Sequence, residues 1–247
     1  MINKNKKIPS IVIIIPARLE SVRLRKKLLK KIDGIPMIIK VAKNAEKLDI
    51  GPVVVGTDSF EILKICKKNK VECLLTNKNH KSGTDRVYEV YKLIDTSYEL
   101  IINLQGDLPI FKKELFEKMI CLFEDKTVDI GSAVCKLDKC EINDTNVVKA
   151  QVNLDKKNTG IALNFSRNVN GNSNFYHHIG VYIYRPKVLE EFIKLKQTKN
   201  EIDRSLEQMR ALDNNYKIKL TKVSYNPPSI DTPNDLRKIR SILKKIK

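Results

Sequence analysis

The chain has 247 residues, of which 42% are hydrophobic, and it carries a formal net charge of +18. This length fits one large domain, or a core with a closely docked smaller lobe. No apolar run has membrane-spanning length, and the first apolar run ends at Pro16 and Arg18 without the small-residue cleavage site of a signal peptide, so we expect a cytosolic protein without membrane insertion.

The positive charge arises from 47 basic and 29 acidic residues. Such an excess is compatible with binding to nucleic acid or to an anionic membrane. However, the lysines recur along the whole chain, which has no Trp and only 6% aromatic residues, a thin supply of base-stacking side chains. We therefore favour lysine-rich solvated surfaces and expect no nucleic-acid partner.

Short apolar runs alternate with amphipathic stretches in the first half of the chain. The apolar runs predict strands at 11–15, 53–56, 71–75 and 100–104, and the amphipathic stretches predict helices at 36–48, 59–68, 83–93 and 113–123. Fully apolar strands that alternate with helices indicate a parallel sheet covered on both faces. Because ligands of such sheets bind beyond the carboxyl ends of the strands, we expect the polar residues after Ile15, Gly56 and Leu104 to cluster.

The second half is richer in strands. The pattern predicts strands at 130–137, 147–154, 160–165, 179–184 and 217–223, with a helix at 204–212. A polar loop at 168–174 contains Gly171. The chain ends in a helix that begins at Pro233, with Thr232 as its N-cap.

A run of cations follows the first predicted strand. Five of them lie within ten residues: Arg18, Arg23, Arg25, Lys26 and Lys27. At the functional end of a buried strand, such side chains could hold a triphosphate and neutralise a departing pyrophosphate. The alternative is a solvated basic loop. The chain has neither a P-loop nor a GxGxxG fingerprint, so a phosphate site would have to be built in another way.

Two aspartates occupy positions suited to a metal ligand. Asp107 follows Gly106 directly after a predicted strand, and Asp231 precedes Thr232. Magnesium prefers one or two carboxylates together with phosphate oxygens. A turn or a helix cap explains either aspartate equally well. The segment 82–86 is similarly ambiguous, because it could contact a nucleotide or simply start a helix.

Taken together, these segments resemble the 3-deoxy-manno-octulosonate cytidylyltransferases, also called CMP-Kdo synthetases. The likeness runs from about residue 11 to 243. In the first half the matching segments are PAR-x-x-S-x-RL-x-x-K at 16–27, GIPMI at 34–38, GTD at 56–58, HKSGTDR at 80–86 and NLQGDLP at 103–109. In the second half they are NVVK at 146–149, FSR at 165–167, HIGVYIYR at 178–185, SLEQMRAL at 205–212 and IDTPNDL at 230–236. Each segment alone has little specificity, whereas the ordered set is specific.

The resemblance implies an α/β fold of the nucleotide-diphospho-sugar transferase type, with a Rossmann-like mixed sheet and a smaller strand-rich lobe. In this single nucleotidyltransferase domain, residues of about 1–127 would form the CTP-binding core and residues of about 128–225 the sugar-binding and dimerisation part, and 226–247 would return to the core. The implied protein is a cytoplasmic homodimer. Its implied reaction is the attack of the anomeric hydroxyl of Kdo on the α-phosphorus of CTP, which releases pyrophosphate and supplies CMP-Kdo for lipopolysaccharide biosynthesis.

The matched positions also imply a role for each site residue. The triphosphate would be held by Arg18 and Lys27, with Arg23 nearby. The cytidine site would be lined by Ala17, Ser82, Arg86 and Gln105. The sugar acid would be bound by Arg167, His178, Tyr182, Glu207 and Gln208. Mg²⁺ would be the cofactor, with Asp107 and Asp231 as its ligands, and the catalytic residues would be Arg18, Lys27, Asp107 and Asp231.

Elementary chemistry agrees with these roles. Transfer at phosphorus depends on positioning and charge neutralisation more than on covalent help. A metal ion held by Asp107 and Asp231 could orient the attacking hydroxyl and lower its pKa, which would account for the lack of an obvious general base. The planar guanidinium of Arg167 suits bidentate pairing with the sugar carboxylate.

The chain departs from the family pattern at three places. Arg25 and Lys26 stand where the family usually has Pro-Gly, and Leu108 replaces the usual Glu of a GDEP motif. The segment between Arg167 and His178 is shorter than the family generally carries. These departures leave two alternatives open: the same chemistry on another sugar acid, such as 8-amino-Kdo, sialic acid or pseudaminic acid, and an inactive paralogue.

Overall fold

The computed structural model describes residues 9–21, 23–169 and 174–246, so most of the N-terminal segment and Gly171 of the predicted polar loop lie outside the described residues. The chain folds as two compact units. Unit 1 consists of Met1–Asp107 and Asp231–Lys247, and unit 2 consists of Leu108–Ile230. The division expected from the sequence, a CTP-binding core of about 1–127 with 226–247 and a sugar-binding part of about 128–225, stays a prediction.

Unit 1 contains a parallel sheet, as the apolar runs predicted. Its strands lie in the order β5 (Cys73–Leu75), β4 (Val53–Thr57), β1 (Ile11–Ala17) and β6 (Leu100–Asn103), and every neighbouring pair is parallel. The central strand β1 is buried over its whole apolar run. Such burial on both faces is the reason that the sequence shows continuous apolar runs in place of an alternating pattern.

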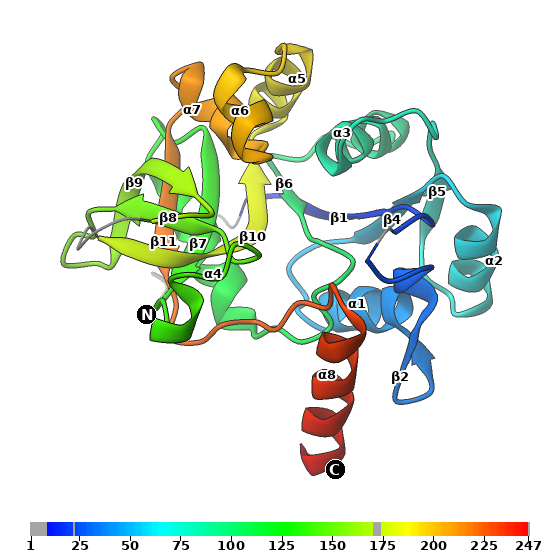
Figure 1. Cartoon of the computed structure of the whole chain (residues 1–247). Coiled ribbons are helices and arrows are strands. Elements are labelled where there is room, and N and C mark those ends of the chain that lie inside the picture. Colours follow the sequence, from blue (N-terminus) through cyan, green and yellow to red (C-terminus); the bar gives the residue numbers. More distant parts are fainter. Residues whose placement is uncertain (1–8, 22, 170–173, 247) are drawn as a thin grey trace. The chain divides into compact units, whose positions relative to one another are not determined.

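Helices α1 (Met37–Glu46) and α3 (Gly83–Leu93) lie on opposite faces of this sheet (Figure 1). Helix α2 (Phe60–Lys68) packs near β5, at the end of the strand order. The prediction of Thr232 as the N-cap of α8 (Pro233–Ile246) is confirmed, because its Oγ1 accepts a hydrogen bond from the backbone N–H of Asp235 at 3.2 Å. The carboxylate of Asp235 accepts in turn from the backbone N–H of Thr232 at 2.9 Å, which completes a capping box.

A small hairpin in unit 1 was not predicted. Strands β2 (Lys31–Ile32) and β3 (Ile35–Pro36) are antiparallel and follow the short 3₁₀ helix η1 (Lys27–Leu29). The turn residues Asp33 and Gly34 have φ values of 55° and 79°. An Asp-Gly pair is the sequence signal for such a two-residue turn, and it was available in the sequence.

Unit 2 contains five strands whose pairing closes into a ring. The order is β10 (Phe175–Tyr184), β7 (Ile130–Cys135), β11 (Ile218–Lys222), β9 (Thr159–Ser166) and β8 (Lys149–Val152), and β8 also pairs with β10. All of these pairs are antiparallel except β11 with β7. All five strands were predicted, within a few residues at each end.

The helices of unit 2 correct one prediction. The sequence predicted a single helix at 204–212, whereas α6 (Lys199–Arg204) ends at the first residue of that range and a separate helix, α7 (Gln208–Asp213), follows. Ser205 separates them in the left-handed conformation, with φ of 53°. The turn lets Glu201 of α6 face Arg210 of α7, and the two side chains form a buried bidentate ion pair with distances of 2.8 and 2.6 Å.

Other helical segments of unit 2 are α4 (Lys113–Cys121), α5 (Pro186–Lys194) and the 3₁₀ turns η2 (Leu122–Glu124) and η3 (Lys139–Glu141). Helices α5, α6 and α7 gather at one end of the strands (Figure 1). Helix α5 was not predicted. Its signals were Pro186 at the first helical position and the spacing of Val188, Leu189 and Phe192, which form its buried face.

Candidate functional site

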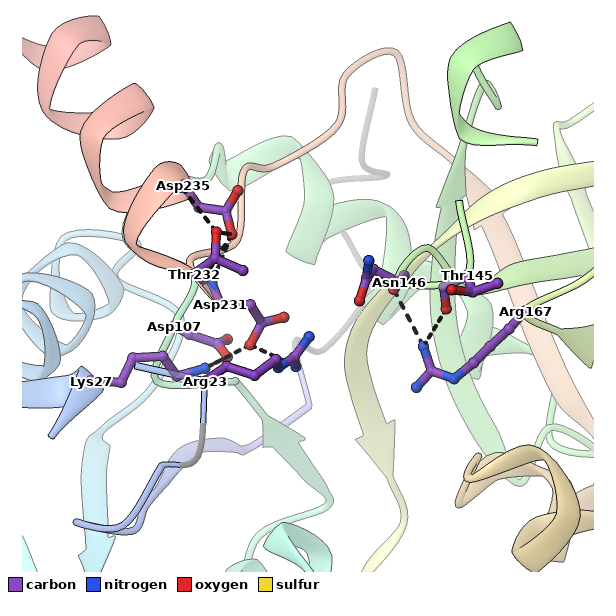
Figure 2. A network of polar contacts seen from close by, with 9 residues as sticks. All are labelled: Arg23, Lys27, Asp107, Thr145, Asn146, Arg167, Asp231, Thr232 and Asp235. Carbon is purple, nitrogen blue, oxygen red and sulfur yellow. Dashed lines mark hydrogen bonds and ion pairs between the residues drawn. The ribbon is translucent and has the colours of Figure 1, made fainter. Parts of the chain in front are cut away.

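Polar residues gather beyond the carboxyl ends of the strands of unit 1, where the strand pattern of the sequence predicted a cluster. Lys27 comes from the segment after β1, Asp107 follows β6, and Asp231 precedes α8. Figure 2 shows these side chains turned toward one another, together with Arg23. Asp58, which follows β4, accepts a hydrogen bond from the backbone N–H of Leu19 at 3.3 Å, so it too contacts the segment after β1.

The Lys27 ammonium lies between the two predicted metal ligands. Its Nζ donates to Asp107 Oδ2 at 2.6 Å and to Asp231 Oδ1 at 3.0 Å, while Arg23 Nη2 lies 3.1 Å from the same Asp231 oxygen (Figure 2). Burial acts to lower the pKa of Lys27, but the two carboxylates outweigh it and raise that pKa above its usual value. Both carboxylates therefore already converge on one cation, and Lys27 stays charged.

The turn that carries Lys27 contains Arg25 and Lys26, where the family pattern has Pro-Gly. Lys26 adopts φ 51° and ψ 43°, a left-handed conformation that favours glycine. Its Nζ also contacts Glu61 Oε2 at 2.7 Å. The departure from Pro-Gly thus places a non-glycine residue in a left-handed conformation at Lys26, and Lys27 still contacts both aspartates.

The predicted cytidine residues of unit 1 have structural partners of their own. Ser82 is the N-cap of α3, and its Oγ accepts from the backbone N–H of Asp85 at 3.1 Å. Arg86 is buried, donates to Asp58 Oδ2 at 2.9 Å and also contacts Thr76 Oγ1.

Other residues predicted to bind the nucleotide lie at or just beyond the ends of β1 and β6. Gln105 Nε2 donates to Asn103 Oδ1 at 3.0 Å. Ala17 is buried at the end of β1, and Arg18 beside it is exposed. Of the seven residues predicted to bind the nucleotide, Ala17 and Arg86 are buried. The other five keep part of their surface accessible.

In unit 2, Arg167 at the end of β9 is tied to the loop that precedes β8. Its Nη1 donates to the carbonyl oxygens of Thr145 at 3.0 Å and Asn146 at 3.3 Å (Figure 2). Within the described part of the chain, no contact of Nε or Nη2 is seen. These two groups form one edge of the planar guanidinium, the geometry that binds a carboxylate bidentately.

Lys149 supports Arg167, and sequence reasoning gave it no role. Its side chain is fully buried, and Nζ donates to the carbonyl oxygens of Asp144 at 2.6 Å and Arg167 at 2.7 Å. Burial lowers the pKa of Lys149. A fully buried lysine is rare unless it is paired. The signal available in the sequence was the position of Lys149 in the NVVK segment.

The remaining predicted sugar residues lie on β10 and α7. His178 and Tyr182 have ring centroids 5.5 Å apart, and burial lowers the pKa of His178 to about 3. Burial also raises the pKa of Tyr182, which therefore keeps its phenolic proton. Glu207 Oε1 lies 3.6 Å from Arg210 Nη2, and Gln208 is buried at the start of α7.

The chain is similar to known proteins over almost its whole length. A family model described as "Cytidylyltransferase" matches residues 12–218. The 3-deoxy-manno-octulosonate cytidylyltransferase of Bartonella tribocorum is 40% identical over 94% of this chain and 98% of its own length. The enzyme of the same name from Rickettsia prowazekii is 39% identical over 96% of each chain.

The chain belongs to the 3-deoxy-manno-octulosonate cytidylyltransferase family. The resemblance inferred from the ordered segments is thereby confirmed, and the chain is a cytidylyltransferase. A solved structure of "CMP:2-keto-3-deoxy-manno-octonic acid synthetase complexed with CTP" is similar to it, with a TM-score of 0.87, 30% identity and coverage of 96% of this chain and 100% of that chain.

The predicted fold class is also confirmed for this cytidylyltransferase. A structure of UDP-glucose pyrophosphorylase complexed with UDP-glucose has a TM-score of 0.70 at 14% identity, which is a likeness of fold alone. Among the helices that the structure describes, none is both long enough and apolar enough to cross a membrane.

Proposed function

We propose that the chain transfers CMP from CTP to Kdo and releases pyrophosphate. The observation that carries the proposal is the convergence of Asp107 and Asp231 on the Lys27 ammonium, at 2.6 and 3.0 Å, beyond the ends of β1 and β6. Ligands of open α/β sheets bind at this end of the strands. The family relationship supports the identity of the two substrates. The relatives are named 3-deoxy-manno-octulosonate cytidylyltransferases, a name that specifies a cytidine nucleotide and this sugar acid.

The two aspartates fit a magnesium ion. They are hard oxygen donors, and both already bind one cation, the Lys27 ammonium. Among the described residues no group of three or more His, Cys, Asp or Glu side chains gathers as a metal cluster, which accords with an ion that takes its other ligands from water and phosphate. Mg²⁺ bound there would supply Lewis-acid stabilisation of charge at the α-phosphate.

The side chains of unit 1 would do the remaining electrostatic work. Lys27 stays protonated because its pKa is raised. Its ammonium can therefore exchange the two aspartates for the triphosphate as its ionic partner and keep its charge. Arg23 is more than half exposed and pairs with Asp231 at 3.1 Å, and Arg18 is exposed, so both are free to contact the departing pyrophosphate. Fixed positive charge at this point stabilises the charge that develops in the transition state.

In unit 2, the Nε–Nη2 edge of Arg167 would bind the carboxylate of the sugar acid, and Lys149 would hold the arginine in place. We further propose that the protein acts in the cytoplasm as a homodimer and serves lipopolysaccharide biosynthesis. Kdo is favoured over 8-amino-Kdo, sialic acid and pseudaminic acid because the family relationship extends over almost the whole chain.

Pyrophosphate release tests this function directly. The purified chain is incubated with CTP, Mg²⁺ and one of four sugar acids: Kdo, 8-amino-Kdo, sialic acid or pseudaminic acid. We expect release with Kdo that stops when Mg²⁺ is chelated, with CMP-Kdo identified by mass spectrometry. Pyrophosphate release with one of the other acids but not with Kdo would show that this acid is the substrate. A folded protein that releases no pyrophosphate with any of the four acids would overturn the proposal.

A further inference from the structure

A bulge in β10 lies opposite a buried hydroxyl of β7. The register between the two strands shifts between Ile179 and Ile183. Ser132 stands on β7 across from this shift and is fully buried. Its Oγ lies 2.8 Å from the carbonyl oxygen of Val181 and 3.2 Å from that of Ile179. A carbonyl oxygen can only accept, so the single proton of the hydroxyl is directed to β10.

This arrangement determines how Ser132 meets His178. The Oγ atom lies 3.0 Å from His178 Nε2, a distance at which one of the two atoms must donate. Because the hydroxyl proton is committed to the carbonyl oxygens, Nε2 must carry the proton and donate it to Oγ. A neutral imidazole with its proton on Nε2 has an unprotonated Nδ1, which can only accept.

The imidazole ring is also held in place from two sides. The ring of Phe165 meets it edge-on at a centroid distance of 4.9 Å, and the ring of Tyr182 lies at 5.5 Å. Within the described residues, no protein group is seen to bond Nδ1. The ring is therefore held in orientation, with Nε2 bound to Ser132, while Nδ1 has no hydrogen-bond partner among the described residues.

We propose that Ser132 is a positioning residue that holds His178 as the Nε2–H tautomer, so that Nδ1 accepts a hydrogen bond from a hydroxyl group of the sugar. The inference rests on the proposed function, since sugar binding by His178 belongs to that proposal. It divides the recognition of the sugar acid between two side chains: Arg167 binds the carboxylate, and His178 selects a hydroxyl that donates.

The low pKa of His178 agrees with this division. Burial and the neighbouring His177 lower that pKa to about 3, so the ring is neutral at physiological pH. A neutral ring with a bare Nδ1 repels a carboxylate oxygen and accepts only from a donor. A sugar with fluorine in place of the selected hydroxyl keeps its size and polarity but loses the donor, and it should bind less well.

Nitrogen NMR of the substrate-free protein tests the tautomer without any assumption about the substrate. The ¹⁵N-labelled chain contains three histidines, and the signals of His178 are identified by their loss in His178→Gln. We expect a protonated Nε2 and an unprotonated Nδ1 from pH 5.5 to 8. A protonated Nδ1 in the wild-type protein would overturn the inference, whether or not the chain acts on Kdo.

Two substitutions test the role of Ser132. Ser132→Ala removes the hydroxyl, and Ser132→Cys nearly preserves its buried volume while offering only a weak acceptor. For both we expect an appreciable Nδ1–H population and a KM for Kdo raised by about tenfold, with an unchanged KM for CTP. The cysteine variant keeps the test usable if the alanine variant folds poorly. An unchanged tautomer together with an unchanged KM for Kdo would overturn the positioning role.

Substrate analogues then test the acceptor. Kdo analogues with one hydroxyl replaced by fluorine are compared for the wild type and for His178→Gln, whose amide nitrogen can still donate to Ser132 but which lacks Nδ1. We expect one analogue to lose about tenfold in kcat/KM with the wild type and to lose little with the variant. Equal losses in both proteins for every analogue would overturn the inference. Failure of the wild type to use Kdo at all would instead refute the proposed function.

Discussion

The two units hold their candidate site residues by different means. In unit 1 the side chains neutralise one another as ions, with Lys27 and Arg23 paired to Asp107 and Asp231. In unit 2 the side chains are tied largely to backbone carbonyl oxygens, as in the contacts of Arg167, Lys149 and Ser132. An ionic cluster can exchange its partners for a metal ion or a phosphate, whereas bonds to backbone carbonyls fix a shape. We therefore expect metal and charge to govern unit 1, and geometry to govern unit 2.

The largest effect is expected in the ionic cluster. Asp107→Asn removes one of the two carboxylates that converge on Lys27, and we expect pyrophosphate release to fall by roughly 100- to 1,000-fold with saturating substrates. Asp231→Asn should behave similarly. Glu61→Gln, which removes a carboxylate of the same unit whose ion pair in the described part of the chain is with Lys26, serves as the control. Activity of Asp107→Asn close to that of the control would remove the metal assignment.

In unit 2 the largest effect should appear in stability. Lys149→Met keeps the length of the side chain but leaves the carbonyl oxygens of Asp144 and Arg167 without their donor. We expect the free energy of unfolding to fall by about 2 to 4 kcal/mol in urea denaturation. Lys156→Met, at an exposed position after β8, should change it by less than about 0.5 kcal/mol. Equal stability of the two variants would contradict the supporting role of Lys149.

Acid should weaken unit 2 through His178. Because its folded-state pKa is lowered to about 3, the unfolded chain binds a proton that the folded chain does not take up as pH falls below 6.5. This contribution to stability is present above pH 6.5 and declines toward pH 3, with a slope of at most about 1.4 kcal/mol per pH unit. Unfolding measured from pH 7 to 4.5 should therefore be less pH-dependent in His178→Gln; parallel curves would count against a neutral buried ring.

A smaller effect should separate the two substrates. Arg167→Lys retains the charge but loses the planar edge formed by Nε and Nη2. We expect the KM for Kdo to rise about tenfold while the KM for CTP stays nearly constant. The control is Arg237→Lys, at an exposed position. Arg204 is unsuitable as a control because its side chain binds Asn164 and Phe165 of β9. Equal losses for CTP and Kdo would contradict the role given to Arg167.

The smallest effect concerns the turn that carries Lys27. Lys26→Gly relieves the left-handed backbone at φ 51° but loses an exposed ion pair and loosens the unfolded chain. We expect stability to rise by about 0.5 kcal/mol or less, with activity unchanged. Lys26→Ala loses the same ion pair but keeps the strain, so it should be less stable than the glycine variant. The reverse order would show that the turn is not strained.

Much of the fold could be predicted because its signals are local. Continuous apolar runs such as Ile11–Ile15 specify buried parallel strands, and Thr232 before Pro233 specifies a helix start. The single helix predicted at 204–212 was wrong because a non-local contact decides the chain path there. The ion pair between Glu201 and Arg210 requires a turn at Ser205, which no local propensity signals.

The site shows the same division. The end of β1 and the position of Asp107 followed from the strand pattern, whereas pairing Asp107 with Asp231 came from the family resemblance; the two carboxylates do converge on Lys27. Lys149 and Ser132 were missed because their roles arise from burial and from contacts across strands. The sequence does not distinguish a buried lysine from a solvated one. A serine within an apolar strand likewise shows no sign of a role in the sequence.

The order of the strands has a consequence for synthesis on the ribosome. In unit 2, β11 lies between β7 and β9, although it is the last strand to be made. In unit 1, Asp231 and α8 arrive after all of unit 2 has emerged. Strand β11 must therefore enter between two strands that are made before it, and the second carboxylate beside Lys27 is made only after all of unit 2. A chain truncated before Asp231 would lack one of the two carboxylates beside Lys27, so we expect it to form no complete ionic cluster.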